Sequence, residues 1–467
     1  MSGERLERTL DLLRGATVDT EFDGQLWLVG GYVRDKILGV QSPSDDVDIV
    51  LEQDSAALAL LVHAKGMAQH FPVTYPRFGT AMVTVDGVNV ELVTARRESY
   101  AAGSRKPESV EPATIAEDAR RRDFTINTLL ENLHTGELVD PLGSGKADLA
   151  AGTIRTPLPA DDTFADDPLR MLRAVRFAAR FSFNIEPSTW LAIAGKADRL
   201  FPTVSGERIR DEFNKILLSV DPVPGLKLLQ QSGLLSEFAP EIAGMVGVEQ
   251  NEFHVFPVWE HTLAVLESLI TDHPDAPLLL RLAVLLHDCG KPSTRTVGPD
   301  GRVHFYGHQD AGALLTRQFM GRLKFSHADI DMVSALVAQH MRIGEYKPDE
   351  WSDAAVRRFI RTAGPRLESL FQIHRADVAG LGPQFQDISR AIELRQRIAR
   401  LQADVDSISM DSPLSGSEIM AVVGTAAGPE IGRIKAALTD AVIEGKLRPT
   451  DKDAAAKLAQ VLYSKAT

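Results

Sequence analysis

Two aspartates near the start of the chain have the type and spacing of a metal-binding pair. Asp46 and Asp48 lie two residues apart in a predicted strand, 46–51, so both side chains leave the same face. Carboxylates held this close repel each other, and a bound divalent cation relieves the repulsion. Two Mg²⁺ ions held in this way can activate an attacking hydroxyl group and stabilise a pyrophosphate leaving group. A solvated strand edge is the alternative, and the aspartates alone do not exclude it.

A pair of glycines precedes these aspartates and indicates what such a metal would act on. Gly30-Gly31 joins a predicted strand, 26–29, to a predicted helix that ends near Leu38. Glycine lets the backbone approach a phosphate, and a helix N-terminus offers free N–H groups with positive potential. A glycine pair by itself is more often an ordinary turn. Followed by the two aspartates, it indicates a site for nucleotide phosphates.

A third carboxylate is a candidate ligand for the same metal. Residues 80–85 and 88–94 are predicted to form a hairpin, because the intervening Asp86-Gly87 favours a tight two-residue turn. Alternation buries Val88, Val90 and Leu92 on one face and leaves Glu91 on the other. Glu91 is therefore either a third ligand or a surface residue.

A predicted helix in the middle of the chain carries an arginine face. At 100° per residue, four arginines fall within about a third of its circumference: Arg170, Arg173, Arg176 and Arg180. Such a face is costly unless anions lie opposite, and a triphosphate or an RNA backbone would suit it. A ring of carboxylates from a nearby segment is the alternative, with Glu207, Asp211 and Glu212 as its candidates.

Asp167 and Arg170 form a second kind of pair at the start of that segment. They are three residues apart, so a continuous helix would place both on one face. An aspartate acceptor and an arginine fork can together hydrogen-bond the Watson–Crick edge of a base. Taken alone, such a pair is more often an intrahelical salt bridge.

The second half of the chain carries histidines and aspartates suited to a metal centre. His287-Asp288 ends an apolar helix, 278–286, and the other members are spread over neighbouring helical segments. Side chains of these types, projecting inward from several helices, suit one or two divalent metals of unspecified identity. The candidate ligands are His261, His287, Asp288, His308, His340 and Asp377. Each histidine alone would more often be a packed or surface residue.

The elements that must position these groups divide the chain into an α+β head and a helical remainder. Short β-branched runs alternate with turns and helices, such as 55–65, up to about residue 150. From about residue 165 the hydrophobic pattern has the period of a helix almost to the end. We predict four parts: an α+β head, a helical neck, a helical body that carries the histidine and aspartate candidates, and a helical tail, at 1–150, 151–250, 251–385 and 386–467.

Bulk composition sets limits on the class of protein. The chain has 467 residues, and no apolar run approaches the roughly 18 that a membrane span needs. The single cysteine, Cys289, rules out an internal disulfide and suits a reducing compartment, so we expect a cytoplasmic protein. A net charge of −13 argues against non-specific nucleic-acid binding by the whole surface, but not against a local basic channel.

The ordered motifs of the first half resemble those of class II tRNA nucleotidyltransferases, within the polymerase-β-like nucleotidyltransferase superfamily. Gly30-Gly31 through Asp35, followed by Asp46-Val47-Asp48, resembles the family signature. Residues 121–127 resemble its ribose-recognition motif and 140–143 its hinge motif. Residues 166–170 resemble its nucleobase-selecting motif, with Asp166 where a glutamate is usual, and 207–212 its last neck motif.

The resemblance implies a role for each motif residue in template-independent addition of CCA to the 3′ end of tRNA. Asp46 and Asp48 would hold Mg²⁺, with Asp123 reading the ribose. Asp167 and Arg170 would accept CTP or ATP in place of a template. The remaining nucleotide-binding candidates would hold the triphosphate, the ribose or the RNA backbone: Gly30, Gly31, Arg34, Arg122, Asn127, Arg173 and Arg176.

The second half resembles HD-domain metal phosphohydrolases over about 255–380, and 413–432 resembles the end of bacterial CCA-adding enzymes with such domains. The resemblance implies tRNA, CTP and ATP as partners. It also implies that the head is catalytic, that the neck selects the nucleobase, that the body binds a metal and that the tail binds RNA. Four alternatives stay open: a poly(A) polymerase, an enzyme adding only CC or only A, a protein acting mainly as an HD phosphohydrolase on cyclic or nucleotide phosphates, and a non-catalytic RNA-binding protein. A further alternative is that the HD fold has no hydrolase activity and only supports the RNA.

Overall fold

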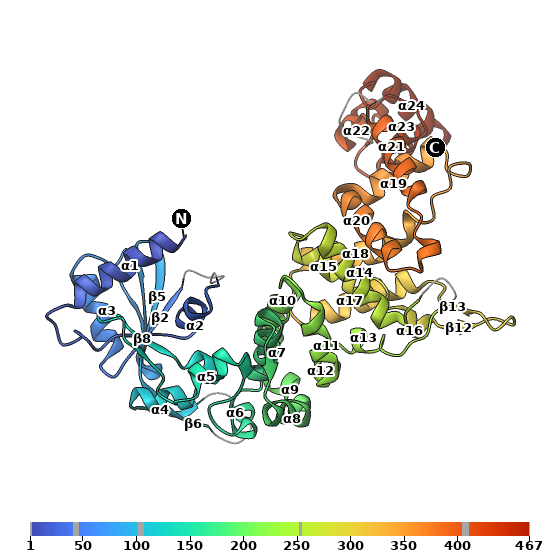
Figure 1. Ribbon diagram of the computed structural model, residues 1–467. Coiled ribbons are helices and arrows are strands. Elements are labelled where there is room, and N and C mark those ends of the chain that lie inside the picture. Colours follow the sequence, from blue (N-terminus) through green and yellow to red (C-terminus); the bar gives the residue numbers. More distant parts are fainter. Residues whose placement is uncertain (1, 41–45, 101–106, 252–254, 404–410, 467) are drawn as a thin grey trace. The chain divides into compact units, whose positions relative to one another are not determined.

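The computed structural model describes residues 2–466 except 41–45, 101–106, 252–254 and 404–410 (Figure 1). The chain forms two compact units, one of residues 1–243 with 322–325 and one of 244–321 with 326–467. The predicted α+β class is confirmed, because the sheet lies in the first unit and helices dominate the rest. The finer division into four parts stays a prediction. Among the described residues, no helix is both long and apolar enough to span a membrane.

A seven-stranded sheet in the order β3-β4-β5-β2-β1-β8-β9 organises the head. Helices α1 (Ser2–Thr17) and α3 (Ser55–Ala64) pack on one of its faces, and α2 (Gly31–Leu38) follows β1. The strands are β1 (Trp27–Val29), β2 (Val47–Leu51), β3 (Val73–Tyr75), β4 (Thr80–Val85), β5 (Val88–Thr94), β8 (Leu130–Asn132) and β9 (Leu138–Val139).

The predicted hairpin is confirmed, and its turn shows why Asp-Gly stands there. Asp86 and Gly87 have φ values of 48° and 78°, and a two-residue hairpin turn with both φ positive follows the twist of the strands. Along β5 the buried residues alternate with exposed ones, so Glu91 lies on the open face as predicted. The predicted strands at 26–29 and 46–51 and the helices after them are also confirmed, with ends shifted by a residue.

Several short elements complete the head. Strands β6 (Arg96–Tyr100) and β7 (Pro107–Pro112) pair with each other. Helix α4 (Ile115–Arg120) starts at a capping box in which Thr114 and Glu117 satisfy each other's backbone N–H groups. The 3₁₀ turn η2 (Thr125–Asn127), helix α5 (Gly145–Ala150) and strand β10 (Thr153–Ile154) lead out of the head.

The helical segment that follows belongs to the same compact unit. Its longest helices, α7 (Leu169–Phe181) and α10 (Gly206–Leu217), pack against each other. The short strand β11 (Asn184–Ile185) pairs with β10. The other helices are α6 (Ala160–Asp166), α8 (Pro187–Lys196), α9 (Leu200–Thr203), α11 (Val223–Gln231), α12 (Leu234–Phe238) and α13 (Pro240–Ala243).

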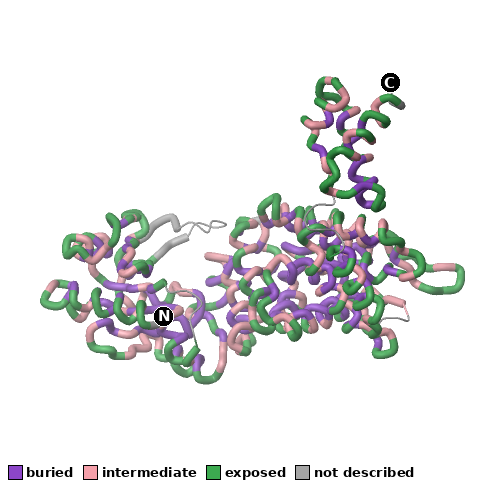
Figure 2. The backbone as a smooth tube through the Cα atoms, turned by 90° about the horizontal axis from the view of Figure 1, so that it is seen from above, coloured by how far each residue is buried: buried purple, intermediate pink, exposed green. Residues whose placement is uncertain are grey.

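The described residues of the second unit are helical except for loops and one small hairpin, β12 (Thr296–Val297) and β13 (Val303–His304), which the period-3.6 prediction missed. Buried residues fill its interior and exposed ones its outer surface (Figure 2). Its main helices are α14 (Val258–Asp272), α15 (Leu278–Leu286), α16 (Lys291–Thr294), α17 (His308–Arg322), α18 (His327–Gln339), α19 (Asp353–Ala363), α20 (Leu367–Ala379) and α21 (Ser389–Ala403). Helices α22 (Gly416–Val423), α23 (Pro429–Ile443) and α24 (Lys452–Ala466) enclose a hydrophobic cluster of their own.

Candidate active site and metal centre

Strand register brings the predicted carboxylates of the head together. β2 and β5 run parallel with Asp48 opposite Glu91, so the two side chains leave the same face of the sheet. Asp46 lies just before β2 and is exposed, and its charge acts on both of the others. On the other side of β2, Asp48 faces Val29 of β1, directly before the glycine pair.

The glycine pair closes tightly over Asp48. Gly30 has a φ of 75°, a left-handed conformation that favours glycine, and a Cβ there would lie 3.3 Å from Asp48 Oδ2. Gly31 is the first residue of α2, so its N–H is one of the free donors at a helix N-terminus. The structure therefore juxtaposes backbone N–H groups, two strand carboxylates and a glycine that cannot be enlarged.

Burial and mutual repulsion shift the titration of these carboxylates. Burial raises the pKa of Asp48, and Arg122 opposes this shift while Asp46 adds to it. Burial, followed by the charge of Asp48, also raises the pKa of Glu91. Raised pKa values mean that the ionised pair is held at a cost, which a divalent cation would offset.

Asp118, which the sequence prediction missed, orients the arginines beside this site. Its Oδ1 accepts hydrogen bonds from Arg121 at 2.6 and 2.9 Å, and its Oδ2 accepts two from Arg122 at 3.0 and 3.1 Å. The spacing of three and four residues could have revealed it, because such residues share a helix face. Held in this way, Arg122 reaches within 4.0 Å of the Cβ position of Gly30.

Asp123 lies at the centre of a buried network. Its Oδ1 accepts hydrogen bonds from Asn127 Nδ2 at 2.9 Å and from the Phe124 N–H at 2.8 Å. Its Oδ2 lies 2.6 Å from an Arg173 nitrogen on α7. Burial raises the pKa of Asp123, but Arg173 and Asn127 outweigh burial and hold the pKa below its usual value. Asp123 therefore stays ionised and links the head to helix α7.

Arg34 is enclosed within the protein. Its guanidinium donates to Asp35 Oδ1 at 2.7 Å and to Asn127 Oδ1 at 2.6 Å, and its Cζ lies 4.8 and 4.7 Å from the ring centroids of Phe177 and Phe181. With an exposure of 3%, this side chain connects α2 to α7. If Arg34 contributes to triphosphate binding, as the sequence predicted, it must do so from this buried position.

The structure corrects the predicted geometry of Asp167 and Arg170. Asp167 has extended backbone angles, φ −141° and ψ 101°, and α7 begins only at Leu169, so the two residues do not share a helix face. Pro168 ends the preceding helix, because the residue before a proline is pushed out of the α region. Arg208 of α10 lies 2.9 Å from Asp167 Oδ2, and Arg170 donates to the Arg121 carbonyl at 2.7 Å.

The arginine face of α7 meets carboxylates, as the alternative interpretation of the sequence allowed. Glu212 lies 2.6 Å from Arg176 and 3.8 Å from Arg173, and Arg180 lies 2.9 Å from Asp35. Of the three carboxylates proposed from the sequence, Glu212 has this role, whereas Asp211 pairs with Arg210. Acids thus compensate part of the arginine charge.

In the second unit, the six candidate metal ligands lie close together around Asp288, and their role as ligands stays a prediction. Asp288 Oδ2 lies 3.2 Å from His287 Nε2 and 3.8 Å from His261 Nε2, and its Oδ1 lies 3.5 Å from His308 Nε2 and 4.0 Å from His340 Nε2. Asp377 approaches from α20, with Oδ1 3.0 Å from His261 Nε2. These six side chains come from five different segments, because His287 and Asp288 are neighbours in the sequence, so tertiary packing builds the cluster.

All four histidines have their rings oriented by the backbone. Nδ1 of each faces a carbonyl oxygen at 2.7–3.3 Å, namely Gly380 for His261, Val284 for His287, Phe305 for His308 and Val337 for His340. A carbonyl only accepts, so Nδ1 of each ring is the donor in this contact, and Nε2 is the nitrogen that faces the carboxylates of Asp288 and Asp377. Backbone partners of this kind orient metal-ligating histidines.

The carboxylates of the cluster favour the protonated form of His287, whereas burial favours the neutral form of His340. Burial lowers the pKa of His287, but Asp288 and Asp377 outweigh burial and raise it to about 10. Burial raises the pKa of Asp288, but His287 and Lys291 outweigh burial and hold it well below its usual value. Burial, with the charge of His287, lowers the pKa of His340 to about 4. A metal cation would displace the proton of His287.

The donor set fits a divalent metal. Among the described residues, two triads place their ligand atoms within 4.8 Å of one another: His261 with His287 and Asp288, and Asp288 with His308 and His340. His287 Nε2 and Asp288 Oδ2 are buried 3.2 Å from each other, so a cation bound by both atoms would replace this ion pair. Asp46, Asp48 and Glu91 do not form so close a group.

Lys291 and Gln250 lie beside the candidate metal ligands, and the sequence analysis assigned neither residue to that site. Lys291 Nζ lies 2.6 Å from Asp288 Oδ2 and 2.6 Å from Gln250 Oε1. Its sequence position, three residues after Asp288 at the start of α16, could have indicated the contact.

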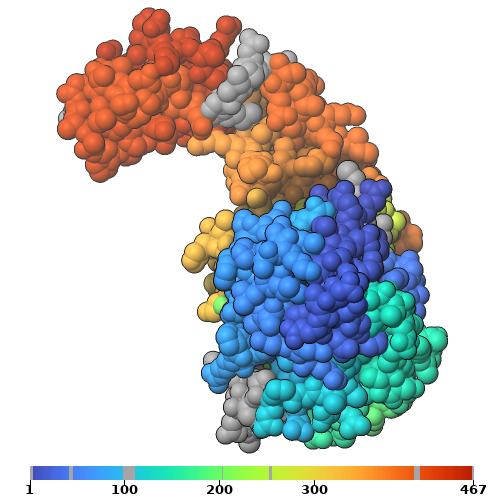
Figure 3. Space-filling view, turned by 90° about the vertical axis from the view of Figure 1, so that its left-hand side faces the viewer, coloured from blue at the N-terminus to red at the C-terminus, as the bar shows by residue number. Residues whose placement is uncertain are grey.

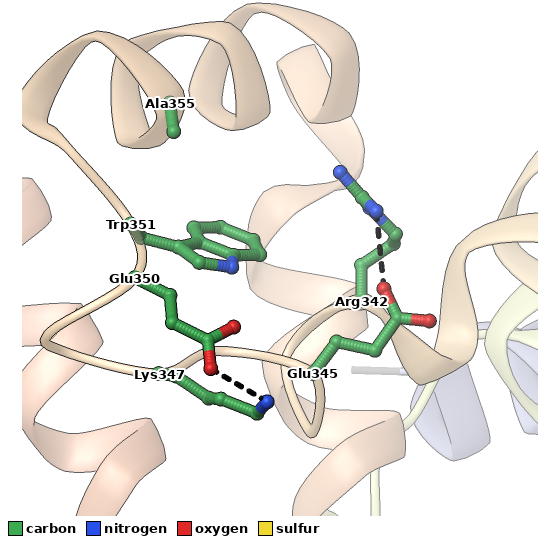
Figure 4. Close-up of a pocket in the computed structure, with 6 residues that line it drawn as sticks. All are labelled: Arg342, Glu345, Lys347, Glu350, Trp351 and Ala355. Carbon is green, nitrogen blue, oxygen red and sulfur yellow. Dashed lines mark hydrogen bonds and ion pairs between the residues drawn. The ribbon is translucent and has the colours of Figure 1, made fainter.

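A cavity of about 420 Å³ lies elsewhere in the second unit, lined by Arg342, Glu345, Lys347, Glu350, Trp351 and Ala355 (Figure 4). Its charged groups pair with one another, Arg342 with Glu345 at 3.0 Å and Lys347 with Glu350 at 2.8 Å. The cavity contains none of the metal-cluster residues, so it is separate from the candidate metal centre.

Geometry defines a class before any relative is considered: a nucleotidyltransferase-type head combined with a helical metal centre of the HD type. Family profiles agree, since the poly A polymerase head domain matches residues 26–155, the probable RNA and SrmB-binding site of polymerase A matches 182–245 and the HD domain matches 258–378.

Relatives agree over most of the chain. It is 37% identical over 429 residues to the A-adding tRNA nucleotidyltransferase of Deinococcus radiodurans, covering 90% of this chain and 92% of that one. It is 36% identical over 315 residues to the multifunctional CCA protein of Nitrosococcus oceani, covering 65% and 71%. The chain belongs to the tRNA nucleotidyltransferase and poly(A) polymerase family, and to its bacterial type with an HD domain.

A solved structure shows that the fold is shared. The CCA-adding enzyme of Bacillus stearothermophilus, in complex with CTP, aligns with a TM-score of 0.67 at 22% identity. The alignment covers 99% of this chain and 98% of that one. The shared fold includes both a sheet-based head and a helical remainder.

Proposed function

We propose that the protein adds CCA to the 3′ end of tRNA, using CTP and ATP without a nucleic-acid template. The observation that carries the proposal is the register of Asp48 opposite Glu91, directly beside the Gly30-Gly31 turn. Membership of the family supports the reaction class, and the printed names of the relatives support tRNA as the acceptor. We also propose a cytoplasmic location, where such a substrate is available.

Asp46, Asp48 and Glu91 would hold Mg²⁺ in the head. When bound, the metal supplies charge that favours the deprotonated 3′-hydroxyl and the pyrophosphate leaving group. The N–H groups of the Gly30-Gly31 turn would bind phosphate oxygens, because they lie at the N-terminus of α2. Arg122, held by Asp118, would add positive charge on the same side.

The nucleoside would be recognised by the residues that connect the head to α7. Asp123, kept ionised by Arg173 and Asn127, offers an acceptor for a ribose hydroxyl group. Asp167, positioned by Arg208, and Arg170 would present an acceptor and a donor fork to the base. Arg34 and Arg176, through Asp35 and Glu212, would fix the position of α7 rather than touch the nucleotide.

Product length on truncated tRNA tests the proposal. A tRNA lacking its last three nucleotides is incubated with radiolabelled CTP, ATP or both. We expect two C residues with CTP alone, two C followed by one A with both, and then a stop. Long A tails would identify a poly(A) polymerase, and binding without any extension would identify a non-catalytic RNA-binding protein.

Partial addition is a second candidate, because the A-adding relative and the multifunctional CCA relative are almost equally similar, at 37% and 36% identity. An enzyme adding only A would extend a tRNA ending in CC with ATP, but would leave the tRNA lacking all three nucleotides unchanged. An enzyme adding only CC would stop after two C residues with both nucleotides present. The same gel separates all three.

A second activity, metal-dependent hydrolysis of cyclic or nucleotide phosphates, is favoured by the four Nε2 atoms that converge on Asp288. Nucleoside 2′,3′-cyclic phosphates and nucleotide monophosphates would be assayed with added divalent metals. Metal content by elemental analysis separates an inactive metal centre from an empty one. A metal-loaded protein without hydrolysis would indicate that the HD fold only supports the RNA-binding parts.

A further inference from the structure

The sheet face that carries the candidate catalytic acids continues past them as an apolar strip. In register, Asp48 of β2 lies opposite Glu91 of β5, Glu91 opposite Met82 of β4, and Met82 opposite Val73 of β3. Residues in such a row share one face of the sheet. Met82, Val73 and Tyr75 have exposures of 39%, 50% and 48%, and we call these three residues the apolar strip.

The opposite face of the same strands is covered. Ala81, Val83 and Val85 of β4 are buried beneath α3, which contacts both β4 and β5. Alternation therefore places one set of side chains in the core and leaves the apolar strip open to solvent. The head, in blue, faces the viewer in the space-filling view of Figure 3.

Cations border the strip at the edge of the sheet. The 3₁₀ turn η1 (Pro76–Phe78) follows β3, and the exposed Arg77 lies over the ring of Phe78 at 5.9 Å. Arg96 donates to the carbonyl of Phe78 and to Thr80 Oγ1, which fixes the turn beside the strip. Exposed apolar side chains next to arginines are the combination that single-stranded nucleic acid requires, bases on the former and phosphates on the latter.

We propose that the apolar strip is the platform for the last nucleotides of the RNA strand whose 3′ end is extended; this inference rests on the proposed function. Gly30, the phosphate side of the site, lies after β1, on one side of Asp48. The strip lies on the other side, across β5. Attacking and leaving oxygens must lie roughly in line in phosphoryl transfer. The acceptor strand therefore enters from the side opposite the triphosphate, along the strip.

Dimensions agree with this path. Met82 and Val73 are two and three strands from Asp48, or about 10 and 14 Å at about 4.8 Å per strand. Three or four stacked nucleotides cover this distance at about 3.4 Å each. With its 3′-hydroxyl at Asp48, the RNA would place a base two to four nucleotides upstream on Met82 and Tyr75. The strip is uncharged, which suits a base and not a phosphate.

Steady-state kinetics of the full chain on truncated tRNA test the platform. The double variant Tyr75→Ala/Met82→Ser should raise the KM for tRNA about tenfold, the effect of losing one base stack, while the KM for CTP stays unchanged. Tyr75→Phe, which keeps the ring, should behave as the unaltered protein. Leu60→Ser is the matched control, because Leu60 is 46% exposed on α3, the helix that covers the other face.

An abasic scan of the primer shows whether a base is the partner. One nucleotide at a time is made abasic over the last four positions of the tRNA. At one position, loss of the base should abolish the difference between the unaltered protein and the double variant. Equal sensitivity to Tyr75→Ala/Met82→Ser at every abasic position, or a raised KM for CTP alone, would overturn the proposal. Failure of the unaltered protein to extend any tRNA would instead refute the proposed function.

Discussion

The head and the second unit both gather carboxylates for a cation, but they use different elements. In the head, neighbouring parallel strands place Asp48 beside Glu91, and the site is open enough for Asp46 and Glu91 to be exposed. In the second unit, helices bring together side chains as distant as His261 and Asp377, which are 116 residues apart, and His261 is fully buried. An open site suits a large substrate that arrives with its metal, whereas a closed cluster suits a resident metal.

The two sites also differ in how they remain stable without a cation. Asp48 and Glu91 have raised pKa values, because burial and mutual repulsion are not compensated. In the cluster, His287 takes up a proton and balances Asp288. The head therefore carries electrostatic strain that a cation would relieve, and the cluster carries a proton that a cation would replace.

The largest effect is expected from removing charge in the head. Asp46→Asn/Asp48→Asn should reduce nucleotide addition by about 10³-fold or more, because several kcal/mol of metal-dependent stabilisation are lost. Without a cation, the melting temperature of the same variant should be no lower than that of the unaltered protein, since the substitutions remove the repulsion between the carboxylates. Product assays and thermal melting measure the two. Retained addition would contradict the metal assignment.

Removing a candidate ligand in the second unit tests whether the two sites act independently. His287→Ala should reduce metal content and any phosphohydrolase activity by at least about 100-fold, while nucleotide addition changes less than about twofold. His327→Ala, at the exposed start of α18, is the control. A parallel loss of both activities would show that the two sites are not independent.

The same difference explains what the sequence could and could not predict. Alternation along 88–94 was enough to predict that Glu91 faces away from the core, and the turn at Asp86-Gly87 fixed the hairpin. The order of residues also predicted which histidines and aspartates come together in the second unit, although not their proximity to Lys291. The prediction that Asp167 and Arg170 share a helix face was wrong, because Pro168 separates Asp167 from the helix that carries Arg170. Arg208 of α10 forms the ion pair with Asp167 that the sequence assigned to Arg170.

An intermediate effect on nucleotide specificity is expected from removing the ion pair between Arg208 and Asp167. Arg208→Ala releases Asp167 and should reduce the preference for CTP and ATP over UTP and GTP about tenfold, since one positioned hydrogen-bond acceptor carries this order of discrimination. Ratios of kcat/KM for the four nucleotides measure it. Arg210→Ala is the control, because Arg210 lies two residues further along α10 and pairs with Asp211 instead, so the ratios should stay unchanged. Unchanged ratios in both variants would argue against a selecting role for Asp167.

The smallest effect is expected in the pH dependence of the head. Because the pKa values of Asp48 and Glu91 are raised, falling pH protonates both carboxyl groups earlier than free ones and weakens cation binding. Nucleotide addition should therefore fall on the acidic side with a slope in log kcat/KM against pH above one. Glu91→Gln removes one of the titrating groups and should reduce that slope by one while preserving addition at neutral pH to within about tenfold, because Asp46 and Asp48 remain. A slope unchanged by Glu91→Gln would place Glu91 outside the metal site. The head would then hold its cation with only Asp46 and Asp48, in contrast to the six candidate ligands gathered in the second unit.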